Sequence, residues 1–374
     1  MGQNTTGMAE STFMNSNTQP LPDRGGLTRR EFLRDTALAT ATLAVGAGRL
    51  GAEPSSSKAL NYNPDMEYRR LGRTGLMVSA VCLGGHWKRI DTVVGTTQNI
   101  DHPDFRKNRY DVVSRCIERG INYIDACTAA EVLVYSRALQ GRRNQMYLGF
   151  SWYEEEMRNQ NFRRADKLLA TLEKGMKQAG LDYVDLWRIT MHEQSSRHSP
   201  AEVDEMMKAL EKAKAQGKAR FTGFSSHDRP HIKWMIETYP KIVDVVLTPY
   251  TAKSKVLPTD SLFDTLKQHD VGMFGIKPFA SNSLFKGNSA LDHPEAEEDN
   301  RRARLAIRYI LCNPTVTAPI PGLINVQQVD NVALAVKERR QLDQNERAEL
   351  DRAAEEMWAR LPAEYQWLKD WEYV

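Results

Sequence analysis

Short apolar segments alternate with longer amphipathic segments through most of this chain. The longer segments repeat apolar residues at helical spacing, as Leu168, Leu172 and Met176 do, so they predict helices. The expected strands are 78–83, 120–125, 146–150, 184–189, 219–224, 243–247, 271–276 and 318–320, and expected helices include 110–119, 162–179, 206–216, 260–268 and 300–311. Eight strands that alternate with helices predict the α/β class and a (β/α)8 TIM barrel. No strand is followed by G-x-G-x-x-G, so a Rossmann domain is not favoured.

Further elements are expected on either side of these repeats. Residues 67–78 predict an N-terminal β-hairpin, and Asp343 is expected to cap a C-terminal helix that runs to about Leu361. The tail is aromatic and is expected to pack on the barrel, through Tyr365, Trp367, Trp371 and Tyr373. Residues 88–109 are long and polar, which predicts either a lid or disorder.

The first 52 residues are expected to be a leader rather than part of the fold. Residues 28–34 read Thr-Arg-Arg-Glu-Phe-Leu-Arg and closely resemble the bacterial twin-arginine export signal. A mild apolar run follows over 37–47, with small residues near Ala47 and Ala52 where cleavage could occur. We therefore expect a periplasmic or otherwise exported protein with the twin-arginine machinery as a partner. The expected division is a leader over 1–52, a linker over 53–66 and the barrel over 67–374.

Composition and charge are those of an ordinary globular protein. Of 374 residues, 41% are hydrophobic, and 51 basic residues nearly balance 48 acidic ones. No basic stripe indicates nucleic-acid binding, and the leader's apolar run is too short for a stable membrane span. The four cysteines, Cys82, Cys116, Cys127 and Cys312, form no C-x-x-C pair, so neither a zinc ribbon nor an iron–sulfur cluster is expected.

Asp125 is the first candidate for chemistry. It ends an apolar strand, where a buried and unpaired charge would cost several kcal/mol. In a (β/α)8 barrel, active sites lie at this carboxyl end of the strands. The alternative is that Asp125 caps the next helix.

Five short motifs resemble the aldo-keto reductase family, in order and at suitable spacing over residues 67–353. They are YRRLGRTG at 68–75 with VCLGG at 81–85, GINYID at 120–125, LDYVDL at 181–186, GKARFTGFS at 217–225 and IPG at 320–322. The resemblance implies a (β/α)8 barrel with NADP or NAD extended across its carboxyl mouth. It also implies hydride transfer between nicotinamide C4 and a carbonyl carbon. A Tyr donates the proton, a Lys paired with an Asp tunes the Tyr, and a His holds the substrate oxygen.

The chain departs from this catalytic set. Asp125 matches the family's Asp, but Ala130, Ser151 and Thr190 stand where the Tyr, Lys and His are expected. The departures predict a non-standard catalytic set, for which the candidates are Asp125, Tyr135, His192, His86 and Lys277. Lys277 could lie near Asp125 and replace the missing ion pair.

The resemblance also assigns cofactor positions. The candidates are Ser225 and Ser226 for the nicotinamide amide, Tyr250 after the sixth strand, Lys277, Ser281, Ser283 and Leu284 in the pyrophosphate loop, and Gly322. Leu247 replaces a common Gln, while Ile324 and Gln328 stand where relatives often place a basic residue. The missing cations weaken the case for NADP over NAD.

Three readings of function follow. The first is an aldo-keto reductase-type oxidoreductase that acts on a small molecule such as a sugar, aldehyde or ketone. The second is a catalytically inactive periplasmic barrel that binds a ligand or partner. The third is a metal-dependent barrel built on His86, His192, His227 and Asp125, although these residues lack the spacing of a metal motif, so no metal is expected.

Overall fold

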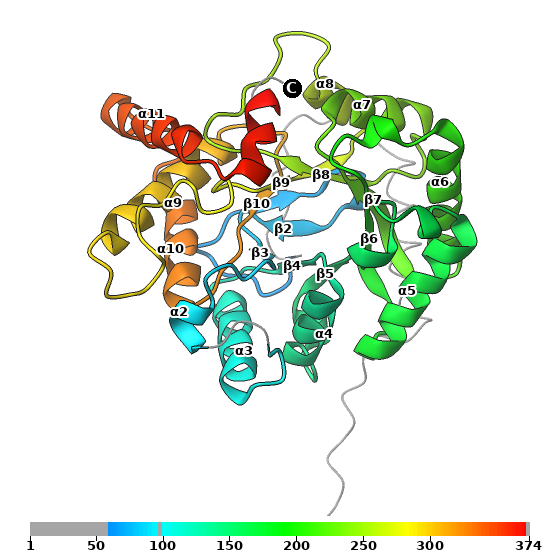
Figure 1. Cartoon of the computed structure of the whole chain (residues 1–374), viewed down its shortest axis with the longest axis horizontal. Coiled ribbons are helices and arrows are strands. Elements are labelled where there is room, and N and C mark those ends of the chain that lie inside the picture. The colour runs from blue at the N-terminus through cyan, green and yellow to red at the C-terminus, as the bar shows by residue number, and fades with distance from the viewer. Residues whose placement is uncertain (1–58, 96–98, 372–374) are drawn as a thin grey trace, which may run out of the picture.

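A computed structural model describes residues 59–95 and 99–371, without the side chains of 370 and 371. The expected leader, Trp371's side chain and Tyr373 lie outside the described residues. Eight parallel strands form a barrel in chain order, as Figure 1 shows. They are β3 (Leu83–Gly84), β4 (Tyr123–Ala126), β5 (Tyr147–Phe150), β6 (Val184–Thr190), β7 (Ala219–Ser225), β8 (Val245–Pro249), β9 (Gly272–Ile276) and β10 (Ala318–Ile320). A parallel bridge between Gly84 and Gly322 closes the ring. The predicted (β/α)8 barrel is confirmed.

Helices surround the barrel (Figure 1). They are α2 (Asp91–Val94), α3 (Pro103–Glu118), α4 (Ala129–Ala138), α5 (Ala165–Ala179), α6 (Pro200–Ala215), α7 (Arg229–Thr238), α8 (Leu262–Gln268), α9 (Ala296–Leu311) and α10 (Val326–Lys337). On α5, Leu168, Leu172 and Met176 are buried, as their spacing predicts. No helix in the described part of the chain is long and apolar enough to cross a membrane.

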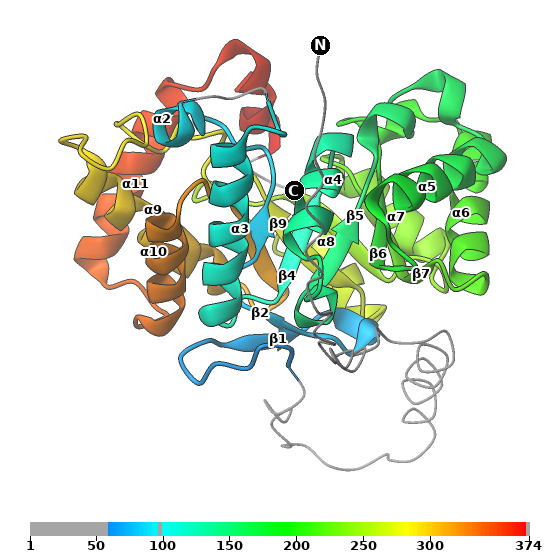
Figure 2. The ribbon, with the colours of Figure 1, turned by 90° about the horizontal axis from the view of Figure 1, so that it is seen from below.

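Two boundaries near the start of the barrel differ from the prediction. The expected strand 78–83 is split, because β2 (Met77–Ser79) belongs to a hairpin with β1 (Tyr68–Arg70) and the barrel strand begins only at Leu83. Figure 2 shows this hairpin at the end of the barrel away from the C-terminal tail. Helix α3 begins at Pro103 rather than Tyr110, since His102 caps it and its first turns are polar.

The C-terminal segment crosses from the outside of the barrel to its carboxyl mouth. Asp343 caps α11 (Gln344–Ala359), and its side chain accepts hydrogen bonds from the amides of Asn345 and Glu346. A 3-10 segment, η7 (Ala363–Trp371), follows and places Tyr365 and Trp367 at the mouth. The predicted packing of the aromatic tail is confirmed for these two residues.

Candidate active site

A cavity of about 410 Å³ opens at the carboxyl ends of the barrel strands. Its walls include residues from six of the barrel strands, the loop after β9 and the tail, among them Gly84, Asp125, Arg188, Ser225, Lys277 and Tyr365. A second cavity of about 410 Å³ adjoins it over α9 and α10. Lys88, Phe279, Asn282 and Gly322 line both cavities, so the two form one extended groove.

The floor of the first cavity holds a buried ion pair. Asp125 on β4 pairs with Arg188 on β6 through two hydrogen bonds, Nε to Oδ1 at 3.0 Å and Nη2 to Oδ2 at 2.5 Å. The side chains are only 7% and 3% exposed, respectively. Burial raises the pKa of Asp125, and the charge of Arg188 opposes this rise. Thr128, not Asp125, caps α4, so the alternative role of Asp125 as a helix cap is wrong.

The partner of Asp125 is Arg188 and not Lys277, so the ion pair that we expected between Asp125 and Lys277 is not formed. Lys277 does line the cavity, but its Nζ lies 5.5 Å from the ring centroid of Tyr365 and 5.7 Å from that of Trp367. Burial lowers the pKa of Lys277. Within residues 59–95 and 99–371 we find no ion pair between Lys277 and a carboxylate.

The positions that replace the family's Lys and His form a small polar cluster. Ser151 Oγ lies 2.9 Å from Thr190 Oγ1 and donates to Glu156 at 2.6 Å. The Thr190 amide also donates to Glu156, at 2.7 Å. Burial raises the pKa of Glu156, and this cluster lies against the Asp125–Arg188 pair through the bond from Arg188 Nη1 to Thr190 at 2.8 Å.

His86 reaches the cavity from the loop after β3. Its Nδ1 lies 2.7 Å from Oε1 of Glu131 on α4, and its amide donates to the same oxygen at 2.7 Å. Glu131 stands next to Ala130, the position where the family places its Tyr.

Tyr135 and His192 do not line either cavity. The Tyr135 hydroxyl is fully buried, donates to the Gly84 carbonyl at 2.7 Å and accepts from Trp87 Nε1 at 2.9 Å. Strand β6 ends at Thr190, so the alternation that would have turned His192 toward the mouth stops before it. These positions do not suit either residue for contact with a substrate in the mouth.

The expected cofactor positions divide into two groups. Ser225, Ser281 and Gly322 line the first cavity, and a Cβ at Gly322 would come within 2.6 Å of the Gly85 carbonyl oxygen. By contrast, four of the expected residues line neither cavity, namely Ser226, Tyr250, Ser283 and Leu284. Ser226 Oγ donates to Ser195 at 2.8 Å, and Tyr250 is buried against Phe263.

Several residues in and around the cavity are not predicted by the sequence motifs. Arg188 and Glu131 were not singled out. For Arg188 a usable signal is its charge inside an apolar strand, whereas Glu131 lies in the first turn of α4 and offers no such signal. His227 was considered only as a metal ligand; its ring stacks on Trp367 at 4.2 Å, and its buried Nδ1 has no hydrogen-bond partner. The described residues contain no group of three or more potential metal-binding side chains, so the metal-dependent reading gains no support.

Comparison with known proteins identifies the class. Residues 93–355 match the profile of the Aldo/keto reductase family, and the chain therefore belongs to this family of oxidoreductases. It is 26% identical over 300 residues to L-galactose dehydrogenase of Arabidopsis thaliana, covering 73% of this chain and 89% of that protein. It is 23% identical over 338 residues to L-glyceraldehyde 3-phosphate reductase of Escherichia coli K12, covering 75% and 92%.

Solved structures share the fold. The holo form of aldo-keto reductase AKR11C1 from Bacillus halodurans matches with a TM-score of 0.57 and 22% identity, covering 77% of this chain and 96% of that one. An aldo/keto reductase from Klebsiella pneumoniae, in complex with NADP and acetate, matches with a TM-score of 0.57 and 20% identity, covering 76% and 94%. The bound NADP in that relative is consistent with the expectation of an NADP or NAD cofactor.

Proposed function

We propose that this protein is an NAD(P)-dependent oxidoreductase that acts on the carbonyl or hydroxyl group of a small, sugar-like molecule through a non-standard catalytic set. The observation that carries the proposal is the buried Asp125–Arg188 pair on the floor of the mouth cavity. This arrangement keeps a carboxylate–cation pair at the reacting end of the barrel, although the cation comes from a different strand. Ionisable residues whose pKa values are shifted and that lie in a cleft are typical of active sites.

The groove fits an extended dinucleotide. Two adjoining cavities run across the mouth, and the loop after β9 bends around them with left-handed backbone at Lys277, Ala280, Ser281 and Asn282. Gly322 lines the groove at a point where any side chain would collide with the Gly85 carbonyl oxygen, so the absence of a Cβ lets the two backbone segments approach closely. When bound, a reduced nicotinamide supplies a hydride to a carbonyl carbon. Ser225, Lys277 and Ser281 are the residues that would hold its polar groups.

The cavity's polar side chains support a polyhydroxylated substrate. Asp125, Arg158, Glu193 and Lys277 supply both donors and acceptors around one space. A site that pairs buried polar groups with substrate hydroxyls discriminates strongly against molecules that lack them. Two relatives are named for a sugar and a sugar phosphate, L-galactose and L-glyceraldehyde 3-phosphate. We therefore place aldoses and their phosphates first among the substrates.

Binding and turnover test this proposal separately. NADH and NADPH are titrated into the purified protein by quenching of tryptophan fluorescence, and a panel of aldoses, triose phosphates and simple aldehydes is assayed for nicotinamide oxidation or reduction. Asp125→Asn should lower kcat by at least tenfold, whereas Asp330→Asn, on the outer surface, should not change it. Binding without turnover would favour the inactive ligand-binding barrel, and the absence of both would end the redox proposal.

We also propose export through the twin-arginine pathway, from the Arg29-Arg30 motif that lies outside the described residues. Replacing both arginines by lysine keeps the charge but removes the recognised pair. In a bacterial host, the wild type should be recovered from the periplasmic fraction and the double-lysine variant from the cytoplasm. Equal periplasmic recovery of the two proteins would contradict export by this route.

A further inference from the structure

We propose that His86 and Glu131 form the acid–base pair of this site, with His86 exchanging a proton with the substrate oxygen and Glu131 positioning its ring. The proposal rests on the redox function proposed above. It places proton transfer at the loop after β3 rather than at Ala130, and it assigns a role to a buried glutamate on α4.

Glu131 is fully engaged in holding this loop. Oε1 accepts from the amide and Nδ1 of His86, and Oε2 accepts from the amide of Cys127, each at 2.7 Å. The carboxyl group is only 4% exposed. Burial favours its neutral form, but the hydrogen bonds from His86 and Cys127 outweigh burial and lower the pKa of Glu131. Its place in the first turn of α4 further suits a carboxylate.

The backbone is shaped to bring His86 onto this carboxylate. His86 adopts a left-handed conformation with φ of 54°, which is uncommon for a residue other than glycine. At Gly85 a Cβ would come within 2.0 Å of the Glu131 carboxyl carbon, so only glycine leaves room for the contact. A strained residue beside an obligatory glycine indicates a geometry kept for function.

The carboxylate fixes which nitrogen of His86 exchanges protons. Because Glu131 can only accept when ionised, Nδ1 is the donor to it, and Nε2 is left for the substrate. The His86 side chain is 53% exposed and lines the cavity together with Asp125. Among the described residues we find no hydrogen-bond partner for Nε2.

The proton and electron balance is complete. As a carbonyl carbon gains a hydride, the electron pair of the C=O π bond moves to the oxygen. That oxygen takes the Nε2 proton of the His86 imidazolium. The ring becomes neutral, and its Nδ1 keeps its proton and its hydrogen bond to Glu131. Oxidation of an alcohol is the reverse. Two other candidates are less free, because Arg188 holds both oxygens of Asp125 and the Tyr135 hydroxyl bonds to the backbone.

The first test needs no turnover. In the full chain, the side-chain ¹⁵N resonances of His86, assigned by their loss in His86→Gln, should show the neutral ring protonated on Nδ1. In Glu131→Gln this tautomer should lose its dominance. A neutral ring protonated on Nε2 in the wild type, or no change in the variant, would overturn the positioning role.

The second test uses activity. His86→Gln and His86→Ala should lower kcat by about a hundredfold or more while leaving the Kd for the nicotinamide cofactor within twofold, and added imidazole should partly restore His86→Ala. His269→Gln, which lies after α8 and lines neither cavity, is the matched control. Wild-type turnover with an unimpaired His86→Gln overturns this proposal alone. A wild type that neither binds cofactor nor turns over overturns the proposed function itself.

Discussion

Arg188 and Asp125 face each other across the strands, with almost no exposure to solvent. Two buried ions attract strongly, yet each has lost its hydration, so the pair as a whole adds little net stability. Removing one partner destabilises the fold strongly, because the remaining charge is left buried without an opposite charge. The pair is therefore better understood as a fixed electrostatic feature of the cavity floor than as a stabilising contact.

Arg188→Met should lower the free energy of unfolding by about 3 to 5 kcal/mol, since it leaves Asp125 unpaired. The double variant Asp125→Leu/Arg188→Met should recover much of that loss. Urea denaturation of the three proteins measures both effects. The control is Arg115→Met, which breaks the surface ion pair between Arg115 and Asp330, whose atoms lie 3.6 Å apart. It should lower the free energy of unfolding by less than about 1 kcal/mol. Equal losses in Arg188→Met and the control would contradict the account.

Tyr365 is another residue of the mouth cavity whose pKa is altered by its surroundings. Lys88 Nζ donates to its hydroxyl at 3.2 Å, and Lys277 Nζ lies 5.5 Å from its ring centroid. Burial of the ring favours the neutral phenol, but Lys277, Ser281 and Lys88 outweigh burial and lower the pKa of Tyr365. The tail therefore brings a phenol with a lowered pKa into the cavity beside the amino groups of Lys88 and Lys277.

Ultraviolet absorbance of the phenolate, followed as pH is raised, should show one tyrosine titrating below the rest. A lowered pKa means that the charged form appears first on the alkaline side, and Tyr365→Phe should remove that first step. Tyr110→Phe, at an exposed position on α3, should leave the step in place. Persistence of the early step in Tyr365→Phe would assign it to another residue.

Residue-scale prediction from sequence depended on motifs. Asp125, Ser225 and Gly322 occupy the cavity because the motif positions that carry them are strand ends, and strand ends define the mouth. Arg188 was not predicted, and Tyr365 was predicted to pack on the barrel but not to line the mouth cavity. A charge inside an apolar strand marks a candidate position, but the sequence does not show which residue across the barrel pairs with it. No sequence rule gives the path of a tail over the mouth.

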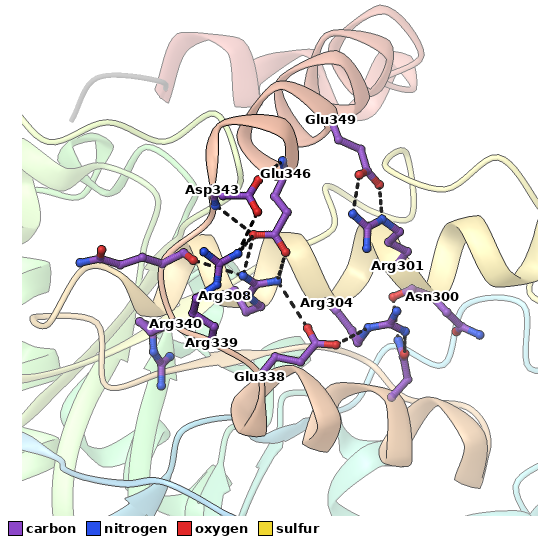
Figure 3. A network of polar contacts seen from close by, with 12 residues as sticks. Asn300, Arg301, Arg304, Arg308, Glu338, Arg339, Arg340, Asp343, Glu346 and Glu349 are labelled. Carbon is purple, nitrogen blue, oxygen red and sulfur yellow. Dashed lines mark hydrogen bonds and ion pairs between the residues drawn. The ribbon is translucent and has the colours of Figure 1, made fainter.

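At the scale of elements, the tail depends on how α11 is fixed. Figure 3 shows a network of arginines on α9 that meets carboxylates on α11 and at the end of α10. Arg308 binds Glu346 through two hydrogen bonds of 2.8 and 2.9 Å, and Arg304 binds Glu338 at 3.0 Å. Arg308 is 4% exposed and Glu346 is 15% exposed, so this pair is shielded from solvent. The network holds the helix that leads into η7.

Glu346→Gln should lower the free energy of unfolding by about 1 to 3 kcal/mol at neutral pH, because a charge-assisted bond is lost. Hydrogen bonds from Arg308 lower the pKa of Glu346 in the folded protein. Its contribution is therefore complete above the unfolded pKa, about 4.3, and disappears as pH falls through the lower folded value. Urea midpoints of variant and wild type should converge in acid. Glu349→Gln, whose partner Arg301 is 45% exposed, is the control and should cost less.

Prediction of the elements succeeded where apolar residues keep a regular helical spacing or where a capping residue marks the start of a helix. The stripe on α5 and the cap at Asp343 were both predicted and found. The first turns of α3 were missed because they are mostly polar and solvent-facing, so their sequence resembles a loop. The first strand was overextended because the three residues between Ser79 and Leu83 are apolar and buried although they form the connection from the hairpin to the barrel. Of these, Cys82 donates a backbone hydrogen bond to a barrel strand, to Pro319 at 3.1 Å.

At the scale of the whole molecule, the barrel could be predicted because alternation of strands and helices allows few closed topologies. The groove across its mouth is a property of the assembled rim and could only be expected by resemblance. Both cavities lie on this rim, one over the barrel axis and one toward α9 and α10. The chemistry of the second cavity bears on the choice between NAD and NADP.

The second cavity is poor in cations. Lys88 is the only Lys or Arg among its described lining residues, and it is already bonded to Ser281 and Tyr365. Ile324 and Gln328 line it where a basic residue would bind a 2′-phosphate, and the carboxylate of Asp299 would repel one. An acidic or neutral wall instead suits the free 2′-hydroxyl of NAD.

We therefore expect NADH to bind at least tenfold more tightly than NADPH, measured by fluorescence titration at one fixed ionic strength. Gln328→Arg should narrow or reverse this preference by improving NADPH binding, since an arginine–phosphate contact adds about 1.5 to 3 kcal/mol. Gln327→Arg also introduces a positive charge at the rim and is the matched control. If residue 328 contacts the phosphate specifically, Gln328→Arg should improve NADPH binding more than Gln327→Arg does. Tighter binding of NADPH than NADH by the wild type would show that another group, such as Lys88 after rearrangement, neutralises the phosphate.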